Sequence, residues 1–403
     1  MSEHKSRTPE ALQKMLRHAA HFSPYYRDFD WARRLRQEKN ISFENDIPVT
    51  FAQQFKENTD RFYSIQVPTN DGKIFTKFTS GSTGRPTKVQ KTALHFQMNA
   101  QENRRLSSGW MLDDHEIVMR LEPKNDLKPP GHVDMKHLQN GSRMFVHYGE
   151  EISSVLSCLL ETSATRLTGM TSILYRVLEL ARENAQTLEL RLACTIGEST
   201  DTVLRNQLED HFGLRIFDTY GAVETGIIAA RCSECGNYHP ADQHLHFEAL
   251  KSDGSLAVPG EVSNIYVTTL YNTAMPLIRF DIGDLVETGE MYSCRRSKFS
   301  ISRILGRRTQ AFHLSDGRVL FPWLPAKEMR ELGVQQYKMI QTTHEDVELR
   351  YIPSNPQHPL SQEQAQSLIN RCLDPCIKAI PIVVDKLPRL ANGKYILHES
   401  LLA

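Results

Sequence analysis

The sequence has no excess of charge of either sign, because 48 Lys and Arg residues balance 48 Asp and Glu residues. A basic excess is the usual mark of nucleic-acid binding, so we expect no nucleic acid among its partners. No apolar run is long enough to cross a bilayer, and no apolar stretch of the signal-peptide type follows Met1–Lys5. We therefore expect a cytoplasmic protein that does not associate with membranes.

Cysteine is also scarce, with 7 residues in the chain. An odd number in a long chain without an export signal argues against a disulfide framework. Closely spaced cysteines are then better considered as metal ligands. The remaining cysteines are expected to be small buried residues: Cys158, Cys194, Cys372 and Cys376.

The length of 403 residues suits a large and a small domain rather than one core. The character of the sequence changes near Leu305–Arg308, after which long apolar runs become rarer. We expect a large domain over residues 1–306 and a small one over residues 307–403.

Helical and β-type patterns alternate through the first three quarters of the chain. A helical pattern over Pro9–Arg36 is interrupted by a turn at Ser23–Pro24, and a short strand over Ile74–Phe78 precedes a glycine loop and a helix over Ala93–Ser107. Further on, helices are expected over residues 173–182 and 202–212, and strands over 192–196, 215–217 and 265–270. This order predicts an α/β fold with a largely parallel sheet. Ligands bind at the carboxyl ends of such strands, where Gly197–Ser199 and Asp218–Gly221 lie.

The glycine loop Thr79–Gly84 has the composition of a phosphate-binding loop. Its glycines permit close approach of the backbone, and its hydroxyl and N–H groups can donate to phosphate oxygens. The Walker spacing is absent, since no Gly-Lys-Ser/Thr follows. Taken alone, a Ser/Thr/Gly stretch is equally typical of a flexible loop.

Five segments, taken together, identify a family. The loop Thr79–Pro86 resembles the phosphate loop of the adenylate-forming superfamily of acyl-CoA synthetases, peptide-synthetase adenylation domains and luciferases. Four further segments resemble that superfamily's other motifs in the same order: Asp218–Glu224, Ile278–Asp284, Leu305–Arg307 and Leu387–Lys394. The early Ser23–Arg27 and a cysteine knuckle after Glu224 are most similar to the phenylacetate–CoA ligase branch. The resemblance implies a large N-terminal adenylation domain and a small, mobile α+β C-terminal domain.

The resemblance also implies a role for individual residues. Glu224 follows a glycine turn and could hold Mg²⁺, and Asp284 could accept hydrogen bonds from ribose hydroxyls. In the family, the counterpart of Arg307 contacts the ribose and phosphate at the hinge, and that of Lys394 stabilises charge at the α-phosphate. The alternatives that stay open are an ordinary surface residue for Glu224, a turn residue for Asp284 and an ordinary surface residue for Lys394.

The expected ATP site combines these residues with the loop. Its members are Thr79, Ser80, Gly81, Ser82, Thr83, Gly84, Gly197, Glu198, Asp218, Thr219, Tyr220, Gly221, Asp284 and Arg307, with Glu224 and Lys394 as the catalytic pair. The expected acid pocket contains Gly169, Met170 and Ala222.

A second constellation, Cys232-Ser-Glu-Cys235-Gly, has the spacing of a metal knuckle. His239 is the nearest third ligand and Cys294 the best distant fourth, while His244 and His246 compete for the histidine position. Four protein ligands would close the coordination sphere and make the site a structural Zn²⁺ site. A redox pair or a knuckle without a ligand stays open.

The sequence thus predicts a two-step ligase that uses ATP and Mg²⁺ to activate a carboxylic acid, in this branch an aryl or arylacetic acid, as acyl-AMP. The thiol of coenzyme A or of an acyl carrier protein would then take the acyl group. The rivals are an adenylyltransferase or amide-forming ligase of the same superfamily, and a regulatory nucleotide-binding protein without catalysis. The oligomeric state is open, a homodimer included.

Overall fold

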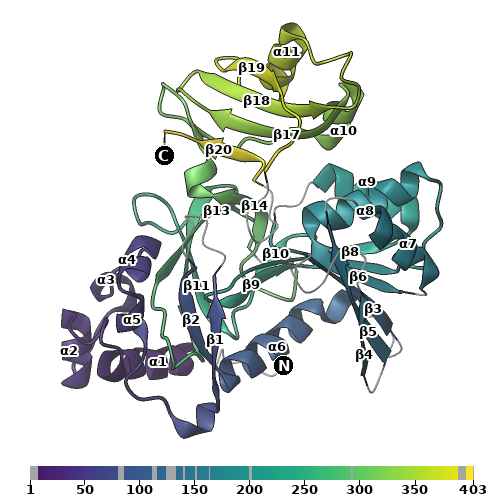
Figure 1. Ribbon diagram of the computed structural model, residues 1–403. Helices are drawn as coiled ribbons and strands as arrows, with labels where there is room; N and C mark the ends of the chain where they lie inside the picture. Colours follow the sequence, from purple (N-terminus) through teal and green to yellow (C-terminus); the bar gives the residue numbers. More distant parts are fainter. Residues whose placement is uncertain are drawn as a thin grey trace. The chain divides into compact units, whose positions relative to one another are not determined.

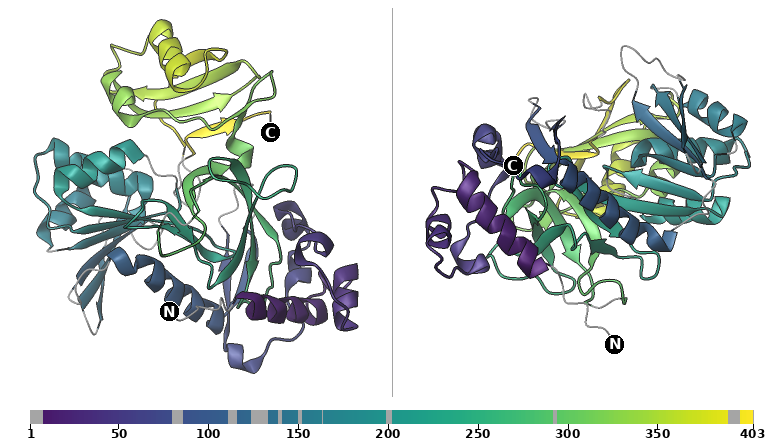
Figure 2. Two further views of the ribbon diagram at one scale, coloured as in Figure 1. Left: turned by 180° about the vertical axis from the view of Figure 1, so that it is seen from behind. Right: turned by 90° about the horizontal axis from the view of Figure 1, so that it is seen from below.

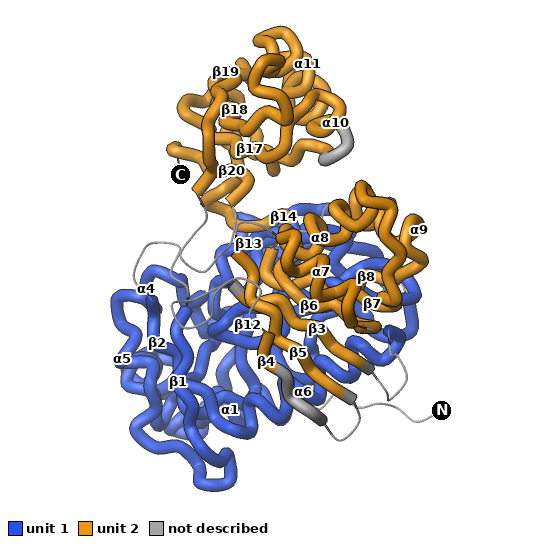
Figure 3. The backbone as a smooth tube through the Cα atoms, turned by 45° about the vertical axis from the view of Figure 1, so that its right-hand side comes forward, with its two compact units in different colours: residues 1–111, 217–304 blue, residues 112–216, 305–403 orange. Residues whose placement is uncertain are grey.

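The computed structural model describes residues 8–79, 86–110, 116–123, 133–138, 141–149, 152–162, 164–198, 202–291, 294–388 and 396–402. Figures 1 and 2 show the chain as a ribbon. It divides into two compact units, which Figure 3 colours separately. Unit 1 consists of Met1–Met111 and Phe217–Ile304, and unit 2 of Leu112–Ile216 and Leu305–Ala403.

Unit 1 begins with a group of short helices: α1 (Thr8–Phe22), α2 (Asp30–Arg36), α3 (Phe43–Asp46), α4 (Ala52–Glu57) and α5 (Thr59–Phe62). The helical pattern with a break at Ser23–Pro24 is confirmed as α1 and α2. After the break, Tyr25 stacks on Phe62 with ring centroids 4.0 Å apart. These aromatic rings belong to the main core of the unit, which explains why the chain turns at this point.

The sheet of unit 1 has the order β11-β12-β13-β14-β10-β9-β8. Its strands are β8 (Arg215–Ala222), β9 (Gly226–Arg231), β10 (Tyr238–Pro240), β11 (Leu245–Leu250), β12 (Val262–Thr269), β13 (Phe280–Thr288) and β14 (Ile301–Arg307). The pairs β8–β9, β9–β10, β11–β12 and β12–β13 are antiparallel. The expectation of a largely parallel sheet is wrong for this unit, because short connections between sequential strands allow only antiparallel pairing.

The glycine loop lies inside a β-hairpin of unit 1. Strands β1 (Ile74–Phe78) and β2 (Lys88–Thr92) pair antiparallel, and α6 (Ala93–Ser107) begins directly after β2. Thr92 caps this helix by accepting a hydrogen bond from His95 N over 3.1 Å. The predicted order of strand, loop and helix is therefore wrong in one respect, since a second strand stands between the loop and the predicted helix.

The first part of unit 2 has the predicted α/β character. It contains β3 (Glu116–Pro123), β4 (Val133–Leu138), β5 (Gly141–Tyr148), α7 (Ser153–Glu161), β6 (Arg166–Met170), α8 (Thr171–Glu183), β7 (Leu192–Ile196) and α9 (Thr202–Phe212). Strands β5, β3, β6 and β7 are parallel neighbours, and β4 pairs antiparallel at the edge. The expected helices and strands of this region are confirmed, and so is the α/β class.

The C-terminal part of unit 2 has its own core. Its elements are β15 (Phe312–His313), β16 (Val319–Leu320), α10 (Ala326–Glu331), β17 (Val334–Gln341), β18 (Asp346–Pro353), α11 (Gln362–Cys372), β19 (Lys378–Val383) and β20 (His398–Ser400). The sheet order is β19-β18-β17-β20, and α11 covers one face of the sheet (Figure 2). The expected domain boundary after residue 306 falls within β14.

Among the described helices, none is both long enough and apolar enough to cross a membrane.

The expectation that the four cysteines outside the knuckle are buried is wrong for Cys376, which is exposed. Cys158, Cys194 and Cys372 are partly buried. Cys376 follows the helix α11 at a turn where its N–H donates to Asp374 Oδ1 over 2.9 Å. A turn of this kind exposes side chains, and an apolar neighbourhood in sequence does not prevent it.

Candidate active site and metal centre

The Asp218–Glu224 segment lies mostly in strand β8. The expectation that it forms a loop after the strand is wrong, because the turn Val223–Thr225 lets β9 fold straight back. Thr219 then pairs with Ala230 and Tyr220 with Ala229. Pairing on both sides of the turn holds the segment as regular strand.

A hydrogen bond joins the Asp218–Glu224 segment to the Ile278–Asp284 segment. The phenol of Tyr220 on β8 donates to Asp284 Oδ2 on β13 over 2.6 Å, and Asp284 is buried. Gly283, with φ of 78°, precedes Asp284 and donates its N–H to Asp281 Oδ1 over 2.8 Å. The glycine conformation and the Asp281 acceptor together fix the backbone that presents Asp284.

Glu224 lies half-buried in the turn between β8 and β9. Its charge acts on Lys91 of β2, whose side chain is only 4% exposed. Burial lowers the pKa of Lys91 to about 8, and the attraction of Glu224 opposes that shift. A buried lysine therefore interacts electrostatically with the half-buried carboxylate of Glu224, the predicted Mg²⁺ residue. Sequence reasoning missed Lys91, because a lysine in a short β-strand carries no signal of burial.

Two histidines that the sequence did not single out as partners also pack together in this region. The rings of His95 and His244 are fully buried with centroids 4.8 Å apart. Burial lowers the pKa of both, that of His244 to about 4. The pair is therefore neutral at physiological pH. His244 Nε2–H donates to Thr225 O over 3.1 Å, so this histidine holds the turn that contains Glu224.

The base of the glycine loop is closed by two hydrogen bonds. Thr79 N donates to Thr87 O over 2.9 Å, and Thr87 N donates to Thr79 Oγ1 over 3.0 Å. This clamp joins the two strands of the hairpin where the loop leaves it. The other predicted members of the loop lie outside the described residues: Ser80, Gly81, Ser82, Thr83 and Gly84.

Four of the predicted residues belong to unit 2 and surround the ends of its parallel strands. Gly169 and Met170 end β6, where they pair with Thr195 and Ile196. Gly197, with φ of 79°, turns the chain after β7. Glu198 Oε2 accepts from Ser172 N over 2.8 Å and so caps the first turn of α8. The structure gives the Glu198 carboxylate a capping role that the sequence did not predict.

The two remaining predicted residues, Arg307 and Lys394, come late in the sequence. Arg307 is the exposed last residue of β14 and belongs to unit 2, whereas Asp284, Tyr220 and the half-buried Ala222 belong to unit 1. Lys394 lies outside the described residues.

The structure brings Cys232, Cys235, His239 and Cys294 together, with one ligand atom from each within 4.8 Å of all the others. His239 Nε2 lies 3.1 Å from Cys294 Sγ and 3.3 Å from Cys235 Sγ, and the Cys232 and Cys294 sulfurs are 3.8 Å apart. The competing His246 packs edge-on against Phe43 instead. Three sulfurs and one imidazole nitrogen in this geometry match a tetrahedral zinc site.

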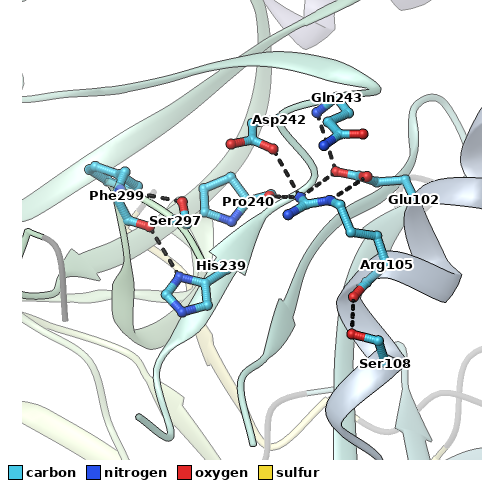
Figure 4. Close-up of polar contacts among 9 residues, drawn as sticks. All are labelled: Glu102, Arg105, Ser108, His239, Pro240, Asp242, Gln243, Ser297 and Phe299. Carbon is cyan, nitrogen blue, oxygen red and sulfur yellow. Dashed lines mark hydrogen bonds and ion pairs between the residues drawn. The ribbon is translucent and has the colours of Figure 1, made fainter. Parts of the chain in front are cut away.

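The imidazole of His239 is oriented by its other nitrogen. Nδ1–H donates to Phe299 O over 3.2 Å (Figure 4). This bond directs Nε2 at the sulfurs of Cys235 and Cys294. A backbone acceptor behind the ring is the usual support of a metal-binding histidine. Burial lowers the pKa of His239, so the ring is neutral as a ligand must be. Burial and the Cys232 thiol raise the pKa of Cys294 to about 11, a cost that a divalent cation would remove.

A cavity of about 250 Å³ borders this cluster, lined by Arg105, Leu106, Ser108, Ala230, Cys232, His239 and Arg296. Its two arginines are already paired. Arg105 binds Glu102 at 2.6 Å and Asp242 at 2.9 Å (Figure 4), and Arg296 binds Glu234 at 2.7 Å. These pairs brace α6 and the knuckle rather than offering an open anion site.

Comparison with known proteins gives a family. A family model described as "AMP-binding enzyme" matches residues 28–247. The uncharacterized acyl-CoA ligase YtcI of Bacillus subtilis is 25% identical over 210 residues, which are 49% of this chain and 38% of that protein. Phenylacetate-coenzyme A ligase of Thermus thermophilus is 30% identical over 125 residues, 30% of this chain and 28% of that protein.

Among solved structures, 2-hydroxyisobutyryl-CoA ligase in its postadenylation state superimposes with a TM-score of 0.72 at 16% identity. The match covers 97% of this chain and 88% of that one. The chain belongs to the AMP-binding enzyme family, and its fold is that of adenylate-forming enzymes. The matched segments span less than half the length of the two curated relatives.

Proposed function

We propose that this protein uses ATP to activate a carboxylic acid as acyl-AMP and passes the acyl group to the thiol of coenzyme A. The observation that carries the proposal is the joining of two motifs by the Tyr220–Asp284 hydrogen bond, in a chain whose residues 28–247 match the AMP-binding family. The curated relatives named above are acyl-CoA ligases, and 2-hydroxyisobutyryl-CoA ligase has been crystallised with 2-HIB-AMP and CoA. All of these support thioester formation.

In the first step the acid carboxylate attacks the α-phosphorus of ATP, and pyrophosphate leaves. The loop Thr79–Gly84 would hold the departing phosphates by its N–H and hydroxyl groups. Asp284, oriented by Tyr220, would accept from the ribose hydroxyls. Glu224 is a half-buried carboxylate of the type that binds Mg²⁺, which when bound neutralises phosphate charge.

The second step would need a different arrangement of the chain. We assign residues 307–403 the role of a mobile lid that carries Lys394 to the α-phosphate and then withdraws it. Arg307 would act at the hinge, as the last residue of β14. Lys394 would stabilise the negative charge that develops during adenylation and would have no part in thiol attack.

We also propose the chemical class of the acid and the identity of the acceptor. The similarity to phenylacetate-coenzyme A ligase favours an aryl or arylacetic acid. Gly169 and Met170 would line its pocket together with Ala222. Coenzyme A is favoured over a carrier protein because the curated relatives are named as CoA ligases. A cytoplasmic location fits a consumer of ATP and coenzyme A.

We also propose a structural Zn²⁺ held by Cys232, Cys235, His239 and Cys294. The proposal is supported by the cluster geometry and by the backbone acceptor behind His239. Because four protein ligands close the coordination sphere, this zinc would stabilise the fold and take no part in the chemistry.

The experiment that tests the ligase function is exchange of labelled pyrophosphate into ATP over a panel of aryl, arylacetic, amino and fatty acids. We expect exchange with at least one aryl or arylacetic acid, and thioester formation when coenzyme A is added. Glu224→Gln should lower exchange about a hundredfold or more at fixed Mg²⁺. Protein that binds ATP but shows no exchange with any acid would instead be a non-catalytic nucleotide binder.

A further inference from the structure

The proposed metal centre and the Asp218–Glu224 segment are connected through one short strand. Strand β10 consists of Tyr238, His239 and Pro240, and its middle residue is a ligand of the cluster. His239 pairs with Ala230 of β9, which pairs in turn with Thr219 of β8. A single row across three strands therefore runs from the metal ligand to the predicted nucleotide motif.

The neighbour of His239 reaches that motif directly. The buried Tyr238 donates its phenol hydrogen to Asp218 Oδ2, and Asp218 is 4% exposed. Tyr238 pairs with Arg231, and extending the β8–β9 register by one residue places Asp218 opposite Arg231 as well. Tyr238 thus spans β9 to bind the first acidic residue of the motif. A hydrogen bond to a carboxylate inside a protein is among the stronger ones.

Adjacent residues of a strand point to opposite faces of the sheet. Tyr238 and Tyr220 share the face of Asp218, whereas His239 and Thr219 share the other face. The two tyrosines therefore bind two acidic residues of the proposed nucleotide site, Tyr238 to Asp218 and Tyr220 to Asp284. Sequence reasoning included Tyr220 and missed Tyr238.

All three residues of strand β10 pair with β9, whereas the other edge of the strand is held mainly by side chains. It is three residues long, and its contact with β14 is the single pair Tyr238–Ile301. His239 is fixed from both ring nitrogens, by Phe299 O on one side and by the Cys235 and Cys294 sulfurs on the other. These contacts add to the pairing with β9 and fix the β14 side of the strand.

We propose that Tyr238 is a positioning residue for Asp218, and that a metal ion in the Cys232–Cys235–His239–Cys294 cluster keeps Tyr238 in place. The metal centre would then influence the affinity of the nucleotide motif through Tyr238. This inference rests on the proposed function, which identifies the nucleotide as ATP, and on the proposal that the metal is zinc.

The test is the affinity for ATP, measured by titration calorimetry, together with metal content. Tyr238→Phe removes one hydroxyl and keeps the ring. We expect it to retain the wild-type amount of zinc and to bind ATP about three- to tenfold more weakly, with a higher KM for ATP and a nearly unchanged kcat. A mere loss of stability would not split KM from kcat in this way.

Tyr351→Phe is the matched control. It removes the hydroxyl that accepts from Leu360 N over 2.6 Å in the C-terminal core. This variant should lose stability while its ATP affinity stays that of the wild type. If both variants weaken ATP binding equally, the effect is general destabilisation and the proposal fails.

Metal removal provides the second arm. Chelator-treated wild-type protein that is still folded by circular dichroism should bind ATP as weakly as Tyr238→Phe, and chelation of Tyr238→Phe should add little further loss. Additive losses, or full affinity without metal, would overturn the link between the metal and Asp218. Absence of ATP binding and of exchange in the wild type would overturn the proposed function itself. Wild-type exchange with an unaltered Tyr238→Phe would overturn this inference alone.

Discussion

Tyr220 and Asp284 lie 64 positions apart in the sequence and form a 2.6 Å hydrogen bond between strands β8 and β13. The acceptor is buried, so the phenol also offsets part of the cost of keeping a carboxylate away from water. A carboxylate held in this way would present a fixed orientation to the ribose in the proposed ATP site. The antiparallel sheet of unit 1 supplies that rigidity.

Substitution of Tyr220 by Phe should lower kcat/KM for ATP about tenfold, because a hydrogen bond to a charged group contributes roughly 1.5 kcal/mol. Initial rates of pyrophosphate exchange at varied ATP would measure it. Asp284→Asn should lower kcat/KM for ATP by at least as large a factor. A Tyr220→Phe enzyme with wild-type kcat/KM would show that the hydroxyl does not orient Asp284 for binding.

In the first part of unit 2, the sequence predicted well those elements that have clear periodic patterns. Helices α8 and α9 and strand β7 fall where the pattern placed them. The sequence did not predict the strand directions of unit 1. Hydrophobic patterning shows which face of a strand is buried but gives little information about which strand is its neighbour. The β1–β2 hairpin was missed for the same reason.

Only the residues of the candidate site that belong to recognisable sequence motifs could be predicted. The proposed ligands Cys232 and Cys235 follow from spacing, and Cys294, the best distant candidate, lies within the cluster. Lys91 and Tyr238 could not be found, since their importance comes from burial and from partners distant in sequence. Such pairs depend on tertiary register, which local patterns do not encode.

Lys394→Ala should separate the two half-reactions. If Lys394 has its proposed role, charge at the α-phosphate would not be stabilised in the variant. Acyl-AMP formation should then fall by about a hundredfold or more, while transfer from supplied acyl-AMP to coenzyme A should persist. Exchange and thioester assays would measure the two steps. Lys386→Ala removes an exposed lysine of the same region and should leave both rates unchanged. Equal loss in both steps for Lys394→Ala would contradict the assignment.

Cys294→Ser should release zinc and destabilise the protein. The residue is separated by 62 positions from Cys232, so a shared ion would tie the β13–β14 connection to the knuckle. Metal analysis should show about one zinc per wild-type chain, with a large loss in the variant and a lower Tm. Cys376→Ser, at an exposed cysteine outside the cluster, should change neither. Zinc-free wild-type protein with the same Tm would rule out a structural metal.

Glu248→Gln should cost about 3–5 kcal/mol of unfolding free energy, because it leaves a buried arginine without its charge partner. Arg279 binds Glu248 at 3.0 and 3.1 Å, and both side chains are 8% exposed. Arg279 also donates to Ile47 O at 2.7 Å, which fastens the N-terminal helices to the sheet. Urea unfolding would measure the loss. Glu10→Gln breaks the exposed pair with Lys14 and should change stability by less than about 0.5 kcal/mol.

Lys91→Met should stabilise the protein at pH 7, by on the order of 2 kcal/mol, because burial lowers the pKa of Lys91 from 10.5 to about 8. Below pH 8 the lysine is charged in both states, and the folded state carries the cost of burying it. Between pH 8 and 10.5 the folded protein has lost this proton and the unfolded chain has not, so wild-type stability rises with pH. The advantage of the variant should therefore shrink as the pH approaches 10.5.

Urea unfolding of both proteins from pH 7 to 10.5 would show this convergence. Lys73→Met is the control, since Lys73 lies over Phe75 at 5.7 Å much as Lys91 lies over Phe96 at 5.8 Å, but it is exposed. Its effect should be small and independent of pH. If Lys91→Met destabilises the protein at pH 7, the attraction between Lys91 and Glu224 outweighs the burial cost, and the lysine then serves to hold Glu224 in place.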